Sequence, residues 1–174
     1  MPLRELHTAH LKLVPKTRDQ VRADIAAMSP VDKAQLSPVW LTRVAASAHV
    51  DPWVHGYSLV ERDTNAVVGS CGFKGPPAEG IVEIAYGVAI EQRGRGYATE
   101  AAAALVAYAF DRDDVNVVRA HTLPDADASQ RVLAKCGFEH VGEVDDPEDG
   151  PVCRFEKRRS AAMSCFDTGA VDDA

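Results

Sequence analysis

The segment that decides the fold runs Ala89-Ile90-Glu91-Gln92-Arg93-Gly94-Arg95-Gly96-Tyr97-Ala98-Thr99-Glu100. It joins an apolar strand pattern at residues 81–90 to an alanine-rich helical pattern that starts at Ala98. The two glycines let the backbone turn sharply and expose successive N–H groups beside the positive end of the next helix. Arg93 and Arg95 add positive charge at the same place. We therefore predict that this loop binds a phosphate or pyrophosphate group.

Three other interpretations of the loop fit less well. A P-loop needs the pattern GxxxxGK[ST], and no lysine follows these glycines. A dinucleotide fingerprint needs GxGxxG directly after a strand, but the third glycine position is occupied by Thr99. A plain glycine loop that only starts a helix would not need the flanking arginines. The residues around the glycines thus favour the anion site.

The patterns outside the loop predict an α+β fold. Helical spacing indicates helices at residues 18–28, 98–110 and 128–136, Ser29-Pro30 favours the start of another, and residues 31–55 are typical of broken helix and loop. Short links among the central strands favour antiparallel hairpins, and the helix after the glycine loop favours one parallel crossover. Strands are expected at residues 6–15, 57–61, 66–74, 81–90, 117–122, 138–143 and 152–157.

The length and charge of the chain limit what it can be. Its 174 residues correspond to one domain at about 100–200 residues per domain. We expect that domain at residues 1–159 and a flexible tail, without periodicity, at residues 160–174. The formal net charge is −7, but eight of the 26 acidic residues lie in an acidic loop at 143–149 and in the tail. The remaining 18 acids face 19 bases, so we expect no nucleic-acid partner.

The cysteines and the hydropathy pattern indicate a cytoplasmic protein. The four cysteines, at positions 71, 136, 153 and 165, lack the CxxC spacing of zinc sites, so we expect no metal. A chain of this length does not need a disulfide framework, and reduced thiols are expected. No apolar run approaches the ~18 residues of a membrane-spanning helix, and the N-terminus lacks a signal pattern. No membrane partner is therefore expected.

The loop Gln92-Arg93-Gly94-Arg95-Gly96-Tyr97-Ala98 resembles the acyl-CoA pyrophosphate motif of the GNAT superfamily of N-acetyltransferases. Residues 128–138, which end in Gly137-Phe138, resemble the last helix of that superfamily. Ser129 together with Gly137-Phe138 is most similar to the branch that contains the ribosomal-protein N-terminal acetyltransferases. The resemblance covers about residues 3–158. It implies a GNAT-like mixed, mostly antiparallel sheet of six to seven strands with about four helices, and acetyl-CoA as the co-substrate.

The resemblance also implies where the cofactor lies. The thioester is expected where the strands at residues 81–90 and 117–122 diverge, with the backbone N–H of Val88 donating to its carbonyl oxygen. Backbone groups beside it are expected to pair with pantetheine, and the glycine loop to hold the pyrophosphate. The expected cofactor-binding residues are Val88, Ala89, Ile90, Arg93, Gly94, Arg95, Gly96, Tyr97, Ala98 and Thr99.

Two residues are candidates for the proton transfers. Glu83 lies in an otherwise apolar strand, so burial is expected to raise its pKa to suit a general base; the alternative is a solvated or Arg-paired carboxylate. Ser129 is expected to protonate the departing thiolate, unless it only caps the last helix. The family often has an Asn and a Tyr where this chain has Ala126 and Leu133. His121 is a further candidate for a proton relay.

The resemblance places the acceptor near the aromatic residues between positions 40 and 57. Trp40, Trp53 and Tyr57 are the predicted substrate-binding residues, with core packing as the alternative role. At pH 7, deprotonating a lysine amine costs about 4.6 kcal/mol and an α-amine only about 1–1.4 kcal/mol. A protein N-terminal α-amine is therefore the favoured acceptor. A small-molecule amine such as an amino acid, polyamine or antibiotic is the second interpretation, and a non-catalytic acyl-CoA-binding module is the third. We expect a monomer or a homodimer.

Overall fold

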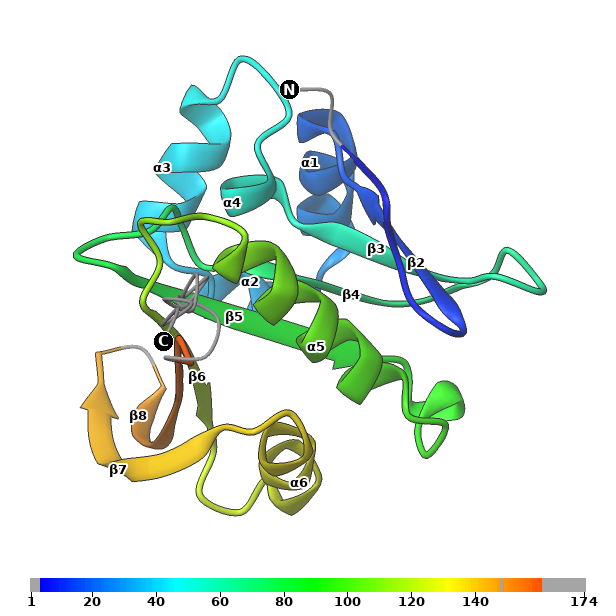
Figure 1. Cartoon of the computed structure of the whole chain (residues 1–174). Coiled ribbons are helices and arrows are strands. Elements are labelled where there is room, and N and C mark those ends of the chain that lie inside the picture. Colours follow the sequence, from blue (N-terminus) through cyan, green and yellow to red (C-terminus); the bar gives the residue numbers. More distant parts are fainter. Residues whose placement is uncertain (1–3, 148, 161–174) are drawn as a thin grey trace, which may run out of the picture.

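A computed structural model describes residues 4–147 and 149–160. These residues form one sheet of eight strands in the order β1-β2-β3-β4-β5-β6-β8-β7 (Figure 1). Only β5 and β6 are parallel neighbours, and every other neighbouring pair is antiparallel. The predicted α+β fold with a mixed, mostly antiparallel sheet is confirmed.

The strands are β1 (Leu6–His7), β2 (Leu11–Pro15), β3 (Tyr57–Glu61), β4 (Val67–Phe73), β5 (Ile81–Val88), β6 (Val117–Thr122), β7 (Glu139–Asp146) and β8 (Gly150–Arg158). The helices are α1 (Arg18–Ala27), α2 (Pro30–Ala34), α3 (Pro38–Ala46), α4 (Pro52–His55), α5 (Tyr97–Phe110) and α6 (Asp127–Lys135), with a short 3-10 helix η1 (Ile90–Gln92).

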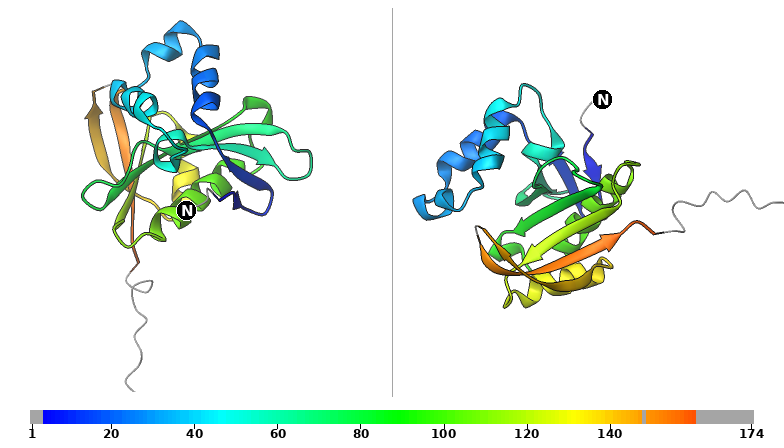
Figure 2. Two further views of the ribbon diagram at one scale, coloured as in Figure 1. Left: turned by 90° about the horizontal axis from the view of Figure 1, so that it is seen from above. Right: turned by 90° about the vertical axis from the view of Figure 1, so that its left-hand side faces the viewer.

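Helices cover both faces of the sheet (Figure 2). α5 and α6 lie on one face, where Ala101, Leu105 and Ala109 of α5 are fully buried in the main core with Ile84 and Val118 of the sheet. α1, α2 and α3 lie over the other face (Figure 2). A smaller second core joins α1, α3 and α4 and consists of Val21, Val44 and Val54 with Ile25 and Trp40. The helices over this face are therefore held by a core of their own.

Three of the helices begin at the same kind of dipeptide. Ser29, Ser37 and Asp51 are N-cap residues whose side chains accept a backbone N–H, and each is followed by a proline in the first turn. A polar cap and a proline with a preset φ both favour a helix start. For this reason residues 31–55, where the sequence indicated broken helix and loop, contain α3, α4 and all but the first residue of α2.

The first predicted strand is divided into β1 and β2, which raises the strand count to eight. Residues 8–10 turn toward α5, where Glu100 accepts hydrogen bonds from Thr8 Oγ1 at 2.6 Å and from the His10 backbone N–H at 2.9 Å. A contact between positions this far apart in the chain leaves no local signal in the sequence.

The predicted acidic loop at residues 143–149 is largely β-structure. Glu143, Val144 and Asp145 pair with Cys153, Val152 and Pro151 of β8, so β7 continues to Asp146. β7 is the edge strand of the sheet. Charged side chains on an edge strand discourage pairing with another chain, which gives these acids a structural role. The predicted tail lies, from residue 161 onward, outside the described residues.

The parallel strands β5 and β6 separate soon after they meet. They pair at Ile81–Val117, Val82–Val118 and Glu83–Arg119, and no pair follows. β5 continues for five residues beyond Glu83, paired only with β4. The backbone edge of β5 toward β6 is therefore open from Ile84 to Val88.

Within residues 4–147 and 149–160, no helix is long and apolar enough to cross a membrane.

Candidate active site

The glycine loop has the geometry of an anion site. Gly94 and Gly96 have φ values of 78° and 80°, which are accessible to glycine at little cost. Gly96 is the N-cap of α5 but offers no side chain to the helix, and the first helical hydrogen bond runs from Glu100 N to Gly96 O at 3.1 Å. The backbone N–H groups that precede Glu100 in the first turn of α5 are left for another acceptor. A Cβ on either glycine would meet no atom within 4 Å, so the space in front of the loop is open.

The hydrogen-bond register gives the direction of the β5 backbone groups. Lys74 N donates to Glu83 O at 2.9 Å and Ala89 N donates to Val68 O at 2.8 Å, so the odd-numbered residues of β5 bond to β4. The even-numbered residues, Val88 among them, then direct their N–H and C=O groups to the open edge. This is the orientation that the predicted role of Val88 requires.

Two neighbouring residues do not have the predicted arrangement. The sequence predicted β5 to end at Ile90, but it ends at Val88, and Ile90 starts η1 with 74% of its surface exposed. The Ala89 N–H already donates to β4, so it is not available to pantetheine. Among the predicted backbone contacts of the strand end, Val88 is the one with its polar groups on the open edge.

A small cavity of about 110 Å³ lies where β5 and β6 separate. Residues that carry hydroxyl groups line it from three elements: Tyr86 from β5, Thr122 from β6 and Ser129 from α6. Tyr86 donates a long hydrogen bond of 3.3 Å to the Ser129 carbonyl oxygen, and burial raises the pKa of Tyr86 well above its usual value. Thr122 Oγ1 is buried and has no hydrogen-bond partner among the described residues. Unpartnered buried hydroxyls are uncommon, which suits a cavity that receives a polar ligand.

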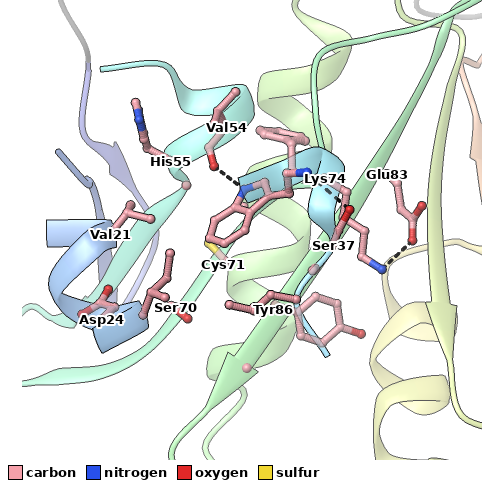
Figure 3. Close-up of a pocket in the computed structure, with 18 of the residues that line it drawn as sticks. Val21, Asp24, Ser37, Val54, His55, Ser70, Cys71, Lys74, Glu83 and Tyr86 are labelled. Carbon is pink, nitrogen blue, oxygen red and sulfur yellow. Dashed lines mark hydrogen bonds and ion pairs between the residues drawn. The ribbon is translucent and has the colours of Figure 1, made fainter. Parts of the chain in front are cut away.

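A second cavity, of about 710 Å³, lies between β4 and β5 and the helices α1 and α3 (Figure 3). This volume is in the range of small-molecule sites. Its lining includes Trp40, Glu83 and the hairpin acids Asp146 and Asp149. The two cavities share Lys74, Ala85 and Tyr86, so they meet across β5.

Glu83 lies at the centre of a hydrogen-bonded chain. Its Oε1 accepts from Lys74 Nζ at 3.1 Å and from His121 Nδ1 at 2.7 Å (Figure 3 shows the lysine contact). Arg154 Nε donates to His121 Nε2 at 3.0 Å. Because an arginine N–H can only donate, Nε2 is the acceptor in this contact, and Nδ1 is the nitrogen that donates to Glu83. Glu83 Oε2 has no partner among the described residues.

The predicted rise in the pKa of Glu83 is wrong. Burial acts in the predicted direction, but the hydrogen bond from His121 and the charge of Lys74 outweigh it, and the pKa is lowered from its ordinary value. The sequence reasoning considered the apolar strand and missed the two donors from other strands. Glu83 is therefore ionised at neutral pH, with one oxygen free to accept from an ammonium group.

Ser129 is not the helix cap that was the alternative to its acid role. The N-cap of α6 is Ala126, which makes no side-chain cap, and Ser129 lies inside the helix on the lining of the small cavity. Leu133, one turn further on, is fully buried in the core. Leu133, at the position where the family often has a Tyr, therefore adds no hydroxyl group to the small cavity.

The three predicted substrate-binding aromatics separate into two groups. Trp40 lines the large cavity, and its Nε1–H donates to Val54 O at 2.7 Å. Trp53 and Tyr57 are 8% and 1% exposed and belong to the main core, so their predicted role is wrong. The ring centroid of Trp53 lies 4.5 Å from that of Phe73 and 5.4 Å from that of Tyr108. For these two residues the core-packing alternative was correct.

The sequence reasoning missed Lys74 and Arg154, which contact Glu83 and His121. A lysine at the end of a strand and an arginine in another carry no motif. The only signal was the pairing of strands: an expected β4–β5 hairpin would have brought Lys74 opposite Glu83. The part of the chain that the structure describes contains no group of three or more His, Cys, Asp or Glu that could hold a metal ion.

Comparisons with known proteins show the family of the chain. Residues 3–139 match the model of the acetyltransferase (GNAT) domain, so the chain belongs to the GNAT acetyltransferase family. The chain is 36% identical over 89 residues to the uncharacterised N-acetyltransferase YjdG of Bacillus subtilis, which is 51% of each protein. The chain thus spans about half the length of the curated relatives it matches.

Solved structures share the fold. The ribosomal-protein-S5-alanine acetyltransferase of Vibrio fischeri is 13% identical with a TM-score of 0.68, and the match covers 91% of this chain and 98% of that one. The structure of RimL, a ribosomal L7/L12 α-N-protein acetyltransferase, in complex with coenzyme A is 17% identical with a TM-score of 0.64, covering 89% and 98%. At these identities the likeness concerns the fold alone.

Proposed function

We propose that this protein is an acetyl-CoA-dependent N-acetyltransferase that moves an acetyl group directly to a primary amine. The observation that carries the proposal is the pair of cavities that meet across β5. One lies at the unpaired edge of β5, the strand that leads to the glycine loop, and the other contains an ionised carboxylate. A thioester and an amine could enter from opposite sides and meet between them.

In the proposed reaction the acetyl thioester lies in the small cavity and the amine comes from the large one. The amine nitrogen attacks the carbonyl carbon, a C–N bond forms and the C–S bond breaks. The Val88 N–H donates to the carbonyl oxygen as negative charge develops on it. The glycine loop, from Arg93 to Thr99, holds the pyrophosphate through backbone amides and the charge of its arginines.

Glu83 receives the acceptor ammonium at Oε2 and takes its proton. A carboxylate with a lowered pKa is a weak base, so this step is easiest for an amine that deprotonates readily. Ser129 supplies a proton to the departing thiolate, and its place on the lining of the small cavity supports that role. No covalent enzyme intermediate is needed.

The acceptor we propose is a protein N-terminal α-amine. An α-amine needs about 3 kcal/mol less than a lysine amine to reach its neutral form at pH 7, and the weak base therefore favours it. Asp146 and Asp149 on the β7–β8 hairpin add negative charge where a cationic peptide would enter. The match in fold to RimL and to the S5 acetyltransferase fits this choice.

A small-molecule amine is the second candidate acceptor. The observation that favours it is the enclosure of the large cavity by α1 and α3, with a volume that suits a small ligand. A cytoplasmic location and a monomeric or homodimeric state remain predictions from the sequence and the family.

The first test is thermal unfolding with acetyl-CoA, CoA and NAD, followed by thiol release with amine acceptors. A ligand at 100 times its dissociation constant should stabilise the fold by about 2.7 kcal/mol. We expect a rise in Tm with acetyl-CoA and CoA, none with NAD, and faster thiol release with N-terminal peptides than with small amines. Stabilisation without thiol release from any amine would instead support a non-catalytic acyl-CoA-binding module. Stabilisation by NAD alone would contradict the cofactor assignment.

A further inference from the structure

Lys74 lies where the two cavities meet. It follows β4 directly, and its backbone N–H donates to Glu83 O at 2.9 Å. Its ammonium is 3.1 Å from Glu83 Oε1, and 48% of its side chain is exposed. Of the three residues that line both cavities, Lys74 is the one that carries an amine.

The position of this amine matches what the proposed reaction asks of an acceptor. An acceptor ammonium must contact the Glu83 carboxylate and lie beside the small cavity. Lys74 Nζ contacts Glu83 Oε1 (Figure 3), and Lys74 is part of the lining of the small cavity. It is also attached to the protein, so it needs no binding step. Groups held together within one molecule can react as if at concentrations far above any free amine.

We propose that Lys74 is a self-acetylation site, modified by the acetyl-CoA bound to the same chain when no acceptor fills the large cavity. The inference rests on the proposed function, because it needs the thioester in the small cavity. Lys74 first loses a proton to Glu83 and, through the open cavity, to solvent. Its Nζ then forms a C–N bond with the acetyl carbon, the C–S bond breaks, and the CoA thiolate takes up a proton.

The modification would change the site itself. An acetylated lysine has no positive charge, so the ion pair with Glu83 would be lost. The Lys74 charge is one of the causes that lower the pKa of Glu83, so the carboxylate would become a stronger base while the acetamide occupies the junction. We expect the occupied junction to dominate and acetylated protein to turn over acceptors more slowly.

The test is peptide mass spectrometry of the purified full chain after incubation with acetyl-CoA alone. Lys16 is a matched internal control, because it also lines the large cavity and also pairs with a carboxylate, Asp24, at 2.8 Å, yet it does not reach the small cavity. Lys33, on exposed α2, reports chemical acetylation by acetyl-CoA in solution. We expect Lys74 to be modified at least about tenfold faster than either.

Further measurements separate self-acetylation from other causes. The rate per molecule should not depend on protein concentration, because the transfer occurs within one chain. It should fall when CoA competes for the site, and Glu83→Gln should slow it. Lys74→Arg should remove the modification, whereas Lys33→Arg should leave the modification of Lys74 unchanged.

The same samples are tested for thermal stabilisation by acetyl-CoA and for thiol release with amines. If acetyl-CoA stabilises the protein and an amine accepts the acetyl group while Lys74 reacts no faster than Lys16, the self-acetylation proposal is overturned and the proposed function stands. If acetyl-CoA neither stabilises the protein nor is consumed, both are overturned.

Discussion

The two sides of the candidate site are built in different ways. On the cofactor side, the part proposed to hold the pyrophosphate is one continuous segment that follows Val88, and it presents mainly backbone groups around two glycines. The acceptor side is assembled from side chains of helices α1 and α3, strands β4 and β5 and the β7–β8 hairpin. The first side needs a backbone shape, and the second needs particular side chains in contact across the sheet.

This difference indicates which half can vary. Backbone amides bind a pyrophosphate whatever the neighbouring side chains are, so binding of the cofactor can be retained while most of these side chains vary. The identity of an acceptor depends on side chains that several segments supply, and each can change separately. Substitutions on the acceptor side should alter turnover and acceptor KM, and substitutions on the cofactor side should alter acetyl-CoA affinity.

The largest effect is expected from Glu83→Gln. The amide keeps the shape and an oxygen acceptor for Lys74 and His121 but cannot take a proton, so kcat should fall by about 10²–10⁴-fold. The acetyl-CoA dissociation constant should not change, because the carboxylate lies on the acceptor side. Steady-state thiol release and thermal shift measure the two effects, with the exposed Glu139→Gln on β7 as control. Unchanged turnover would remove Glu83 from the mechanism.

The two tryptophans compare the acceptor side, where Trp40 lines the large cavity, with the main core, to which Trp53 belongs. Trp53→Ala should lower the free energy of unfolding by about 3–5 kcal/mol, because it empties a packed position in the main core. Trp40→Ala removes a partly exposed ring and one hydrogen bond to Val54, so about 1–2 kcal/mol is expected, together with a higher acceptor KM. Urea unfolding and acceptor kinetics measure both. A larger loss of stability from Trp40→Ala would contradict the assignment of these rings.

On the cofactor side, the double substitution Arg93→Ala with Arg95→Ala should raise the acetyl-CoA dissociation constant by about 5–30-fold. Both side chains are exposed, so each contributes about 0.5–1 kcal/mol, and the effect should shrink at high salt. The kcat measured at saturating acetyl-CoA should not change. Arg158→Ala is the matched control, since Arg158 pairs with Val117 at the opposite end of β6. An unchanged dissociation constant would mean that the pyrophosphate lies elsewhere.

The same contrast explains how far the sequence could be interpreted. The glycine loop, the hairpins and the crossover are local patterns. The hairpins and the parallel crossover were confirmed, and anion binding by the loop stays a prediction. The pKa of Glu83 was predicted in the wrong direction because His121 is 38 positions away and Lys74 belongs to another strand. Trp40 and Trp53 both lie in turn-rich sequence, and only packing against Phe73 and Tyr108 distinguishes the buried ring. Contacts between distant segments leave no local pattern in the sequence, so they could not be predicted from it.

The smallest effect is expected from His55, which stabilises the helices on the acceptor side. The Asp51 backbone N–H donates to His55 Nδ1 at 2.8 Å, and Nε2 is 2.8 Å from Ser47 Oγ, so the ring is neutral. Burial lowers its pKa below 6.5. The unfolded chain therefore binds a proton more readily than the folded one. The contribution of His55 to the free energy of unfolding is fully present above about pH 6.5. It falls as the pH drops toward the pKa of His55 in the folded protein, by at most about 1.4 kcal/mol per pH unit.

Urea unfolding between about pH 7.5 and 5.5 measures this slope, before most carboxylates titrate. His55→Gln should flatten it, and His49→Gln, an exposed histidine on the same segment, should not. Because His55 lies beside the second core and far in sequence from the glycine loop, acidification should raise acceptor KM while the acetyl-CoA dissociation constant holds. A parallel rise in both would mean that the two sides of the site do not respond independently, and the contrast between them would fail.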